Sequence, residues 1–255
     1  MKNDLTFLFF LLLLFSATSH SQNIPADWHD FKLVIGDAIT SPAHYDSRDF
    51  KNLGLTLVAV SGAYFIDNKV KDFSQKQRSL FMNDIFAKDK YFVEIAGSLT
   101  ALTYLYGLAS DNESTRKLGL KLAEAFIING AITAAIKFIV GRERPSTSQS
   151  NNCFDAFSIS WAKTSFPSGH TSTAFTLAAV LANETDQLGW KIFAYSIASA
   201  VGVSRMYNND HWISDVVAGG LIGYFVGEFV SGHKTNNGET VFLSPTALSF
   251  TIPLN

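Results

Sequence analysis

The sequence has little charge and almost no cysteine. Charged residues make up 16% of the 255 residues, against about 25% in an average soluble domain, and Cys153 is the single cysteine. A lone cysteine cannot form a disulfide within the chain, so the fold must hold without one. The formal net charge of −2 provides neither a global basic field for nucleic acid nor an acidic field for cations. We therefore expect no nucleic-acid partner, and any charged ligand must be bound locally.

Apolar side chains are what the sequence has in excess. Hydrophobic residues account for 47% of the chain and include 22 Phe, whereas the 17 Gly and 6 Pro are too few for a collagen-like protein. This composition also excludes a disordered chain. The length allows one large domain or two small ones, each with its own core. The excess apolar residues belong either in a protein core or in lipid.

Residues 1–21 have the plan of a secretory signal peptide. One Lys precedes an apolar run from Leu5 to Phe15, and small or polar residues follow it. The run of about 11 residues is shorter than the roughly 20 that a spanning helix needs. We expect cleavage near Ser21 and Gln22, with an uncleaved anchor as the alternative. Either way the body of the protein is expected to be exported to the periplasm or cell envelope.

The rest of the chain is expected to be an all-α helical bundle of about six to eight helices. Residues 22–51 are mixed and polar and are interpreted as an irregular leader with at most one short helix, around 28–35. Residues 52–232 form the expected helical domain, because apolar positions recur there at helical spacing. Residues 233–255 form a C-terminal tail, expected to be extended, without an assigned function. The expected helical segments are 52–66, 76–88, 90–109, 115–140, 171–183, 189–206 and 213–231.

Composition leaves two environments open for this bundle. Most uninterrupted apolar stretches are only about 11–16 residues long, and the longer ones contain Glu94, Lys121 and Glu124. These observations favour a bundle in water. The alternative is a small membrane protein that crosses the bilayer several times with shortened helices, and membrane association therefore stays open. Nothing in the sequence indicates an oligomeric state.

Three polar segments stand out from the apolar background, and the first is KFIVGRERP, residues 137–145. Lys137 and Arg144 are seven residues apart, so on a continuous helix they share one face, and Pro145 helps to end that helix. Two cations at one helix end can bind an oxyanion. The alternative is a basic helix C-terminus that balances the helix dipole.

The second segment is SFPSGHTS, residues 165–172. Ser168 is a natural N-cap for a helix that begins near His170, and Gly169 allows an anion to approach the backbone. His170 then stands where a proton donor would meet the anion. An ordinary capped helix with an incidental histidine is the alternative.

The third segment is SRMYNNDHWISD, residues 204–215. His211 and Asp215 are four residues apart and would face the same side of a helix, so the carboxylate can accept the Nδ1–H and leave Nε2 free as a nucleophile. Arg205 adds a third cation. A metal site or a surface ion pair are the alternatives, although few other ligands fall at metal-binding spacing.

The order and spacing of these segments, K-x6-RP, PSGH and SR-x5-H-x3-D, resemble the tripartite signature of the type 2 phosphatidic acid phosphatase (PAP2) superfamily. That superfamily includes bacterial class A acid phosphatases and vanadium haloperoxidases. Every defining position of the signature is present. The matching residues are Lys137, Arg144, Pro145, Pro167, Ser168, Gly169, His170, Ser204, Arg205, His211 and Asp215.

The resemblance implies an all-α fold of the PAP2/haloperoxidase type and a phosphatase that needs no metal or other cofactor. Its substrates would be phosphate monoesters, lipid phosphates or lipid diphosphates on the outer side of the cytoplasmic membrane, and vanadate would inhibit it. His211, oriented by Asp215, would form a phosphohistidine while His170 acts as acid and then base. The phosphate oxygens would be bound by Lys137, Arg144, Ser168, Gly169 and Arg205.

Two other functions stay open at this stage. The same residues can bind vanadate as a cofactor for halide oxidation, although the small size of the chain favours a phosphatase. A non-catalytic phosphate-binding protein of the envelope would need the cations but no acid and nucleophile pair, so the intact histidines argue against it.

Overall fold

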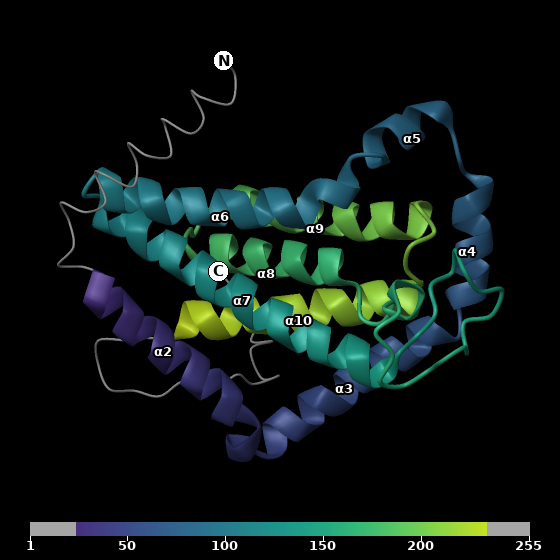
Figure 1. The fold of residues 1–255 in the computed structure, drawn as a ribbon, viewed down its shortest axis with the longest axis horizontal. Coiled ribbons are helices and arrows are strands. Elements are labelled where there is room, and N and C mark those ends of the chain that lie inside the picture. The colour runs from purple at the N-terminus through teal and green to yellow at the C-terminus, as the bar shows by residue number, and fades with distance from the viewer. Residues whose placement is uncertain (1–23, 234–255) are drawn as a thin grey trace, which may run out of the picture.

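The computed structural model describes residues 24–233, and this part of the chain is helical (Figure 1). The signal peptide predicted at 1–21 and all of the tail after His233 lie outside the described residues. The α-helices are α2 (Ile24–Thr40), α3 (Ser47–Tyr64), α4 (Asp67–Lys76), α5 (Leu80–Phe86), α6 (Phe92–Ala109), α7 (Glu113–Val140), α8 (Gly169–Asn183), α9 (Leu188–Tyr207) and α10 (Ile213–Gly232). The expected all-α class is confirmed. Helices α3 and α5 to α10 correspond to the seven segments expected in the domain, whereas α4 lies between two of them and was not expected.

Helix α8 is the centre of the bundle. It packs against α10, α9 and α7, and α4 and α5 lie at one end of these long helices (Figure 1). Small side chains such as Ala178 and Ala179 fill the buried faces of α8. At the crossing with α10, a Cβ on Gly223 would lie 2.1 Å from the carbonyl oxygen of Ser172. Glycine at this position therefore permits the close approach of the two helices.

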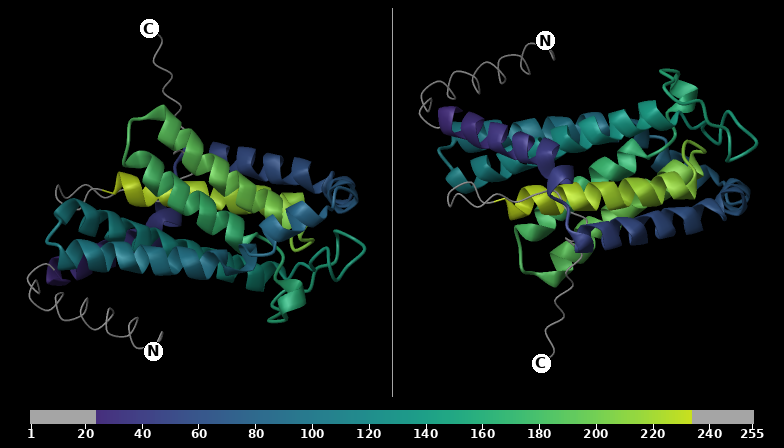
Figure 2. Two further views of the ribbon diagram at one scale, coloured as in Figure 1. Left: turned by 90° about the horizontal axis from the view of Figure 1, so that it is seen from above. Right: turned by 90° about the horizontal axis from the view of Figure 1, so that it is seen from below.

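The leader differs from the irregular segment that we expected. Residues 24–40 form α2, which runs beside α7, and its Val34 belongs to the core (Figure 2). Buried Asp27 forms an ion pair with Arg116 of α7 and accepts a 2.8 Å hydrogen bond from the Tyr104 hydroxyl. Because these partners lie 77 or more residues away in the sequence, local composition could not reveal what stabilises this helix.

The helices are longer than the uninterrupted apolar stretches because they continue through charged residues. The Lys121 ammonium lies 2.6 Å from the Glu184 carboxylate, and Glu124 is buried inside the protein. A paired or buried charge need not face lipid. Lys121 and Glu124 therefore do not limit the length of α7, contrary to what we expected from the sequence.

Three described segments are long and apolar enough to cross a membrane: Leu80–Ala109, Glu113–Val140 and Ile213–Gly232. In the first two, only 22% and 28% of the most apolar window is buried inside the protein. Their apolar side chains therefore face outward, as Leu99 does with 59% of its surface exposed. Such helices indicate a membrane protein, which was the alternative to the bundle in water.

Candidate active site

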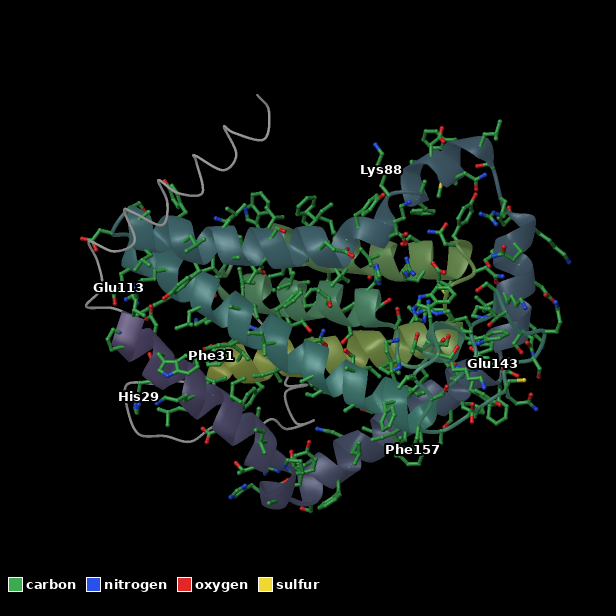
Figure 3. The ribbon with its side chains drawn as sticks, viewed as in Figure 1. His29, Phe31, Lys88, Glu113, Glu143 and Phe157 are labelled. Atoms are coloured by element: carbon green, nitrogen blue, oxygen red, sulfur yellow. The ribbon has the colours of Figure 1, made fainter. Side chains whose placement is uncertain are left out.

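The three cations singled out in the sequence lie at the end of the bundle where α7 and α9 finish and α8 and α10 begin. Lys137 is in the last turn of α7, Arg144 follows in the next loop, and Arg205 is in the last turn of α9. Figure 3 shows nitrogen atoms gathered at this end, close to the labelled Glu143. Arg144 and Arg205 are both buried.

The expectation that Lys137 and Arg144 share one continuous helix is wrong. Helix α7 ends at Val140, well before Pro145, because Gly141 adopts a left-handed conformation with φ of 59°. The Gly141 amide donates a 2.9 Å hydrogen bond to the Lys137 carbonyl, which closes the helix. The chain then turns, so the two cations reach the site from a helix end and from a loop.

The loop holds Arg144 through its backbone and an aromatic ring. The guanidinium donates to the carbonyl oxygens of Trp161 and Asp210 and to the Thr164 hydroxyl, and its carbon lies 4.2 Å from the centre of the Trp161 ring. Burial lowers the pKa of Arg144 to about 10, so the group remains charged at neutral pH. Arg144 is thus a positive charge held in one orientation.

The first and second motifs meet at the N-terminus of α8. The helix begins at Gly169, with Ser168 at the N-cap position, and the Ser168 hydroxyl lies 2.9 Å from the Thr171 hydroxyl. The Lys137 ammonium donates to the carbonyl oxygens of Thr164 and Pro167 at 2.5 and 2.6 Å. A positive side chain therefore lies beside the free amides of a helix N-terminus, which is an arrangement that binds anions.

The third motif joins the same place through Ser168 and Asp210. The Ser168 amide donates a 2.9 Å hydrogen bond to the carbonyl of Asp215 in α10. The Asp210 carboxylate pairs with Arg205 at 2.7 Å, while the Asp210 carbonyl accepts from Arg144. Asp89 pairs with the other side of Arg205 at 2.9 Å, a partner that the sequence did not reveal. All three segments thus converge on one site.

Both histidines lie in this cluster with a buried ring nitrogen that has no hydrogen-bond partner within residues 24–233. The atoms are Nε2 of His170, in the first turn of α8, and Nδ1 of His211, just before α10. Burial, and then the charge of Arg205, lowers the pKa of His170 to about 4. Burial and the cations Lys137, Arg144 and Arg205 hold the pKa of His211 well below its ordinary value. These lowered pKa values favour the neutral form of both imidazoles.

The expected hydrogen bond between His211 and Asp215 is not formed in this structure. His211 precedes α10 and is not on the helix, and its Nδ1 lies 3.6 Å from Asp215 Oδ2, beyond hydrogen-bonding distance. Asp215 instead accepts from the Trp212 amide at 2.9 Å and from the Ser165 hydroxyl at 2.5 Å. Arg142 supplies a further bond of 2.6 Å to Oδ1. Asp215 nevertheless lies next to the histidine that it was expected to orient.

Sequence reasoning missed Arg142 and its second partner, Asp67. Arg142 stands inside the KFIVGRERP segment, but the residues next to it in the sequence do not reveal that it is buried. Asp67 lies in α4, 75 residues earlier, so the sequence does not reveal that the two side chains meet. Within residues 24–233, no group of three or more His, Cys, Asp or Glu side chains is arranged to hold a metal ion. That the site works without a metal remains a prediction.

Residues 118–238 match the family model described as the PAP2 superfamily, a range that includes every predicted site residue. Over 259 aligned residues the chain is 28% identical to a protein named lipid A 1-phosphatase from Porphyromonas gingivalis, covering 97% of this chain and 54% of the relative. An undecaprenyl-diphosphatase from Sulfolobus acidocaldarius is 31% identical over 114 residues, covering 44% of this chain and 53% of the relative. The chain thus spans about half the length of the curated relatives it matches.

Among solved structures, the crystal structure of Aquifex aeolicus LpxE is similar. The TM-score is 0.51 at 21% identity, and the match covers 66% of this chain and 96% of that one. This likeness shows that the two proteins share a fold.

Proposed function

On the premise that residues 118–238 belong to the PAP2 superfamily, we propose that this chain is a phosphatase of lipid phosphates or lipid diphosphates that works through a phosphohistidine. The observation that carries the proposal is the position of His211, a buried imidazole among three cations, beside a second histidine at a helix N-terminus. A protein that only binds phosphate would need the cations but not the two histidines.

The cations and the start of α8 would bind the phosphoryl group. Lys137, Arg144 and Arg205 would neutralise its oxygens, with the Ser168 hydroxyl and the Gly169 amide as further donors. This charge is already in place before substrate arrives, because the loop and α9 hold both guanidinium groups in fixed orientations. Such preorganisation stabilises the charge that develops in the transition state.

The two histidines would divide the chemistry between them. His170 must take up a proton when the anionic phosphoryl group binds, because its imidazole is neutral beforehand. His211 Nε2 then attacks phosphorus in line, the bond from phosphorus to the leaving oxygen breaks, and the protonated His170 gives that oxygen its proton. Water then attacks the phosphohistidine, His170 takes its proton, and phosphate leaves with His211 regenerated. For Asp215 to support the attack, the 3.6 Å between its carboxylate and His211 Nδ1 must close to about 3 Å.

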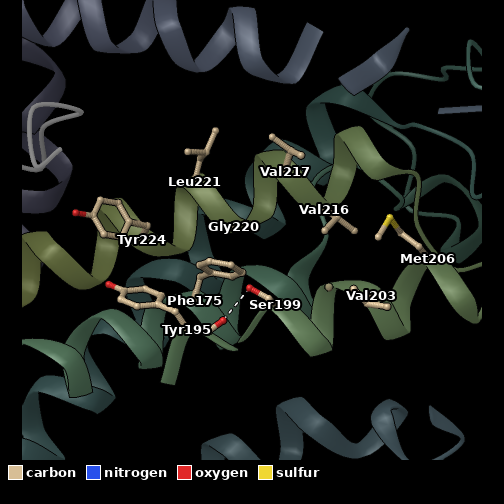
Figure 4. Close-up of a pocket in the computed structure, with 11 residues that line it drawn as sticks. Phe175, Tyr195, Ser199, Val203, Met206, Val216, Val217, Gly220, Leu221 and Tyr224 are labelled. Atoms are coloured by element: carbon tan, nitrogen blue, oxygen red, sulfur yellow. Dashed lines mark hydrogen bonds between the residues drawn. The ribbon is translucent and has the colours of Figure 1, made fainter. Parts of the chain in front are cut away.

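An apolar groove supports a lipid as the leaving group. The groove lies between α8, α9 and α10 and has a volume of about 520 Å³ (Figure 4). It runs from Tyr195 and Tyr224 toward Met206, which also lines a small cavity next to His211. A hydrocarbon chain in this groove would therefore have one end near Met206, close to the candidate nucleophile. Helix α10, which lines the groove, is one of the three helices able to cross a membrane, so the groove would lie within reach of lipid.

The predicted signal peptide and the membrane helices support a site on the outer side of the cytoplasmic membrane. The proposal is tested by measuring phosphate release from a lipid phosphate, a lipid diphosphate and a soluble monoester with purified protein in detergent. His211→Ala should abolish release, whereas His29→Ala, at an exposed histidine of α2, should not. With radiolabelled substrate, the phosphorylated protein should be acid-labile and alkali-stable. Turnover by His211→Ala at the wild-type rate would refute the mechanism.

A further inference from the structure

A chain of three buried charges lies behind the candidate nucleophile. Arg142 Nη2 lies 2.5 Å from Asp67 Oδ2, and Arg142 Nη1 lies 2.6 Å from Asp215 Oδ1. The three side chains are 1%, 0% and 0% exposed for Arg142, Asp67 and Asp215. We call them the Asp67–Arg142–Asp215 triad. Burying three charges is costly, so their arrangement must be well satisfied to persist.

Arg142 has no freedom to rotate within the triad. Its five N–H groups all have acceptors, because Nε donates to the Asn151 carbonyl, Nη2 also donates to that carbonyl, and Nη1 also donates to the Ser214 hydroxyl. Three aromatic rings surround the guanidinium at 5.2 to 5.6 Å from its carbon. The direction from which Arg142 meets Asp215 is thereby set by its other contacts.

Asp67 ties the triad to the start of α10. Its Oδ1 accepts a 2.9 Å hydrogen bond from the Ser214 amide, and its Oδ2 accepts a 2.8 Å bond from the Ser214 hydroxyl. Ser214 stands directly before Asp215 in the chain. Asp67 itself begins α4 and lies outside residues 118–238, so the region matched by the family does not contain this contact.

The triad leaves one oxygen of Asp215 facing the histidine. An arginine with a single carboxylate partner commonly binds both oxygens through two parallel bonds. Here Nη2 pairs with Asp67, so Arg142 binds Asp215 only through the contact between Nη1 and Oδ1. Oδ2 is left to the Trp212 amide, the Ser165 hydroxyl and the approach of His211.

We propose that Asp67 is a positioning residue for the nucleophile. By sharing Arg142, it keeps Asp215 Oδ2 directed at His211 Nδ1, and it fixes the first turn of α10 relative to the histidine. The inference rests on the proposed function, since it assigns Asp67 a part in the attack by His211. The polar partners of Asp67 are Arg142, Asn151 and Ser214, none of which is a phosphate-binding group, so we expect its effect to be confined to the chemical step.

The test is Asp67→Asn in the full chain, assayed for phosphate release, with Asp72→Asn, at an exposed carboxylate of the same helix, as the matched control. A misplacement of about 1 Å at the reacting groups costs on the order of 100-fold in rate. We expect kcat to fall by about 10- to 100-fold in Asp67→Asn. The inhibition constant of inorganic phosphate should stay within about twofold, because the cations are untouched. Control and wild type should behave alike.

A double-mutant cycle separates positioning from general stability. If Asp67 acts through Asp215, adding Asp67→Asn to Asp215→Asn should lower kcat no further. Ser214→Ala is the milder variant should Asp67→Asn fail to fold. It removes the hydroxyl between Asp67 and Arg142 and should lower kcat by about fivefold, as expected for one hydrogen bond.

The outcomes distinguish this inference from the proposed function. Wild-type kcat in Asp67→Asn, multiplicative losses in the cycle, or a weakening of phosphate binding that matches the fall in kcat would each overturn the positioning role. If Asp67→Asn has no effect while His211→Ala is inactive, only this inference fails. If His211→Ala remains active, the proposed function itself fails.

Discussion

Gly141 is a sharp test of how the first motif is built, because it separates Lys137 from Arg144. In Gly141→Ala, the new Cβ would lie 1.7 Å from the carbonyl oxygen of Asp155, and the residue would have to keep a φ of 59°. A non-glycine residue in the left-handed region costs about 1–2 kcal/mol, and forcing an extra carbon into a packed site costs about 1–3 kcal/mol. We therefore expect a loss of about 2–5 kcal/mol in the free energy of unfolding.

The same substitution should also reduce activity. To relieve the contact, the loop that carries Asp155 and Arg144 must move relative to the end of α7, since the Asp155 amide donates to the Gly141 carbonyl at 2.8 Å. A shift of about 1 Å between Lys137 and Arg144 would lower kcat/KM by on the order of 100-fold.

Gly130 provides the matched control on the same helix. A Cβ there meets no atom within 4 Å, so Gly130→Ala should stabilise α7 by about 0.5–1 kcal/mol and leave activity unchanged. Both variants would be compared by denaturant-induced unfolding in detergent and by phosphate release. If Gly141→Ala were as stable and as active as Gly130→Ala, the account of this turn would be refuted.

Three further predictions concern pH, metal and the groove. Burial and Arg205 lower the pKa of His170 to about 4. Between about pH 6.5 and 4 the folded protein therefore binds fewer protons than the unfolded chain. The free energy of unfolding should fall as the pH is lowered through this window. His170→Asn should lessen that fall in thermal melts from pH 7 to 4.5, and an unchanged slope would contradict the shift. Activity should survive dialysis against EDTA, because Lys137, Arg144 and Arg205 supply the positive charge; a loss that a divalent ion restores would show the opposite. Val217→Trp should fill the groove and raise KM about tenfold for a long-chain lipid phosphate, but not for a soluble monoester. This magnitude corresponds to the loss of contacts with two methylene groups at about 0.8 kcal/mol each. Equal changes in KM for both substrates would argue against a lipid chain in the groove.

The helices of the domain could be located from apolar spacing because that signal is local. The segments expected at 90–109, 115–140 and 213–231 correspond to Phe92–Ala109, Glu113–Val140 and Ile213–Gly232. The sequence allowed only a short helix around 28–35 where α2 spans Ile24–Thr40, since buried Asp27 looks like an ordinary polar residue until Arg116 and Tyr104 are placed beside it.

The candidate site was assembled from residue types, and the geometry corrected two of its details. The sequence placed Lys137 and Arg144 on one helix and His211 on another, because spacings of seven and four suit helical turns. Gly141 ends the first helix, and α10 begins only after His211. The motif residues are nevertheless brought together, because the ends of α7, α8, α9 and α10 meet at one end of the bundle (Figure 1).

The sequence by itself determined the helical class and the chemical groups of the candidate site, since periodicity and residue type are properties of short segments. Only the tertiary structure decided the partners of the buried charges. Asp67 meets Arg142 across 75 residues and Ser214 across 147, and no local pattern encodes such a pair. A buried charge takes whichever partner the packed helices bring within reach, so its partner emerges only when the whole bundle is assembled.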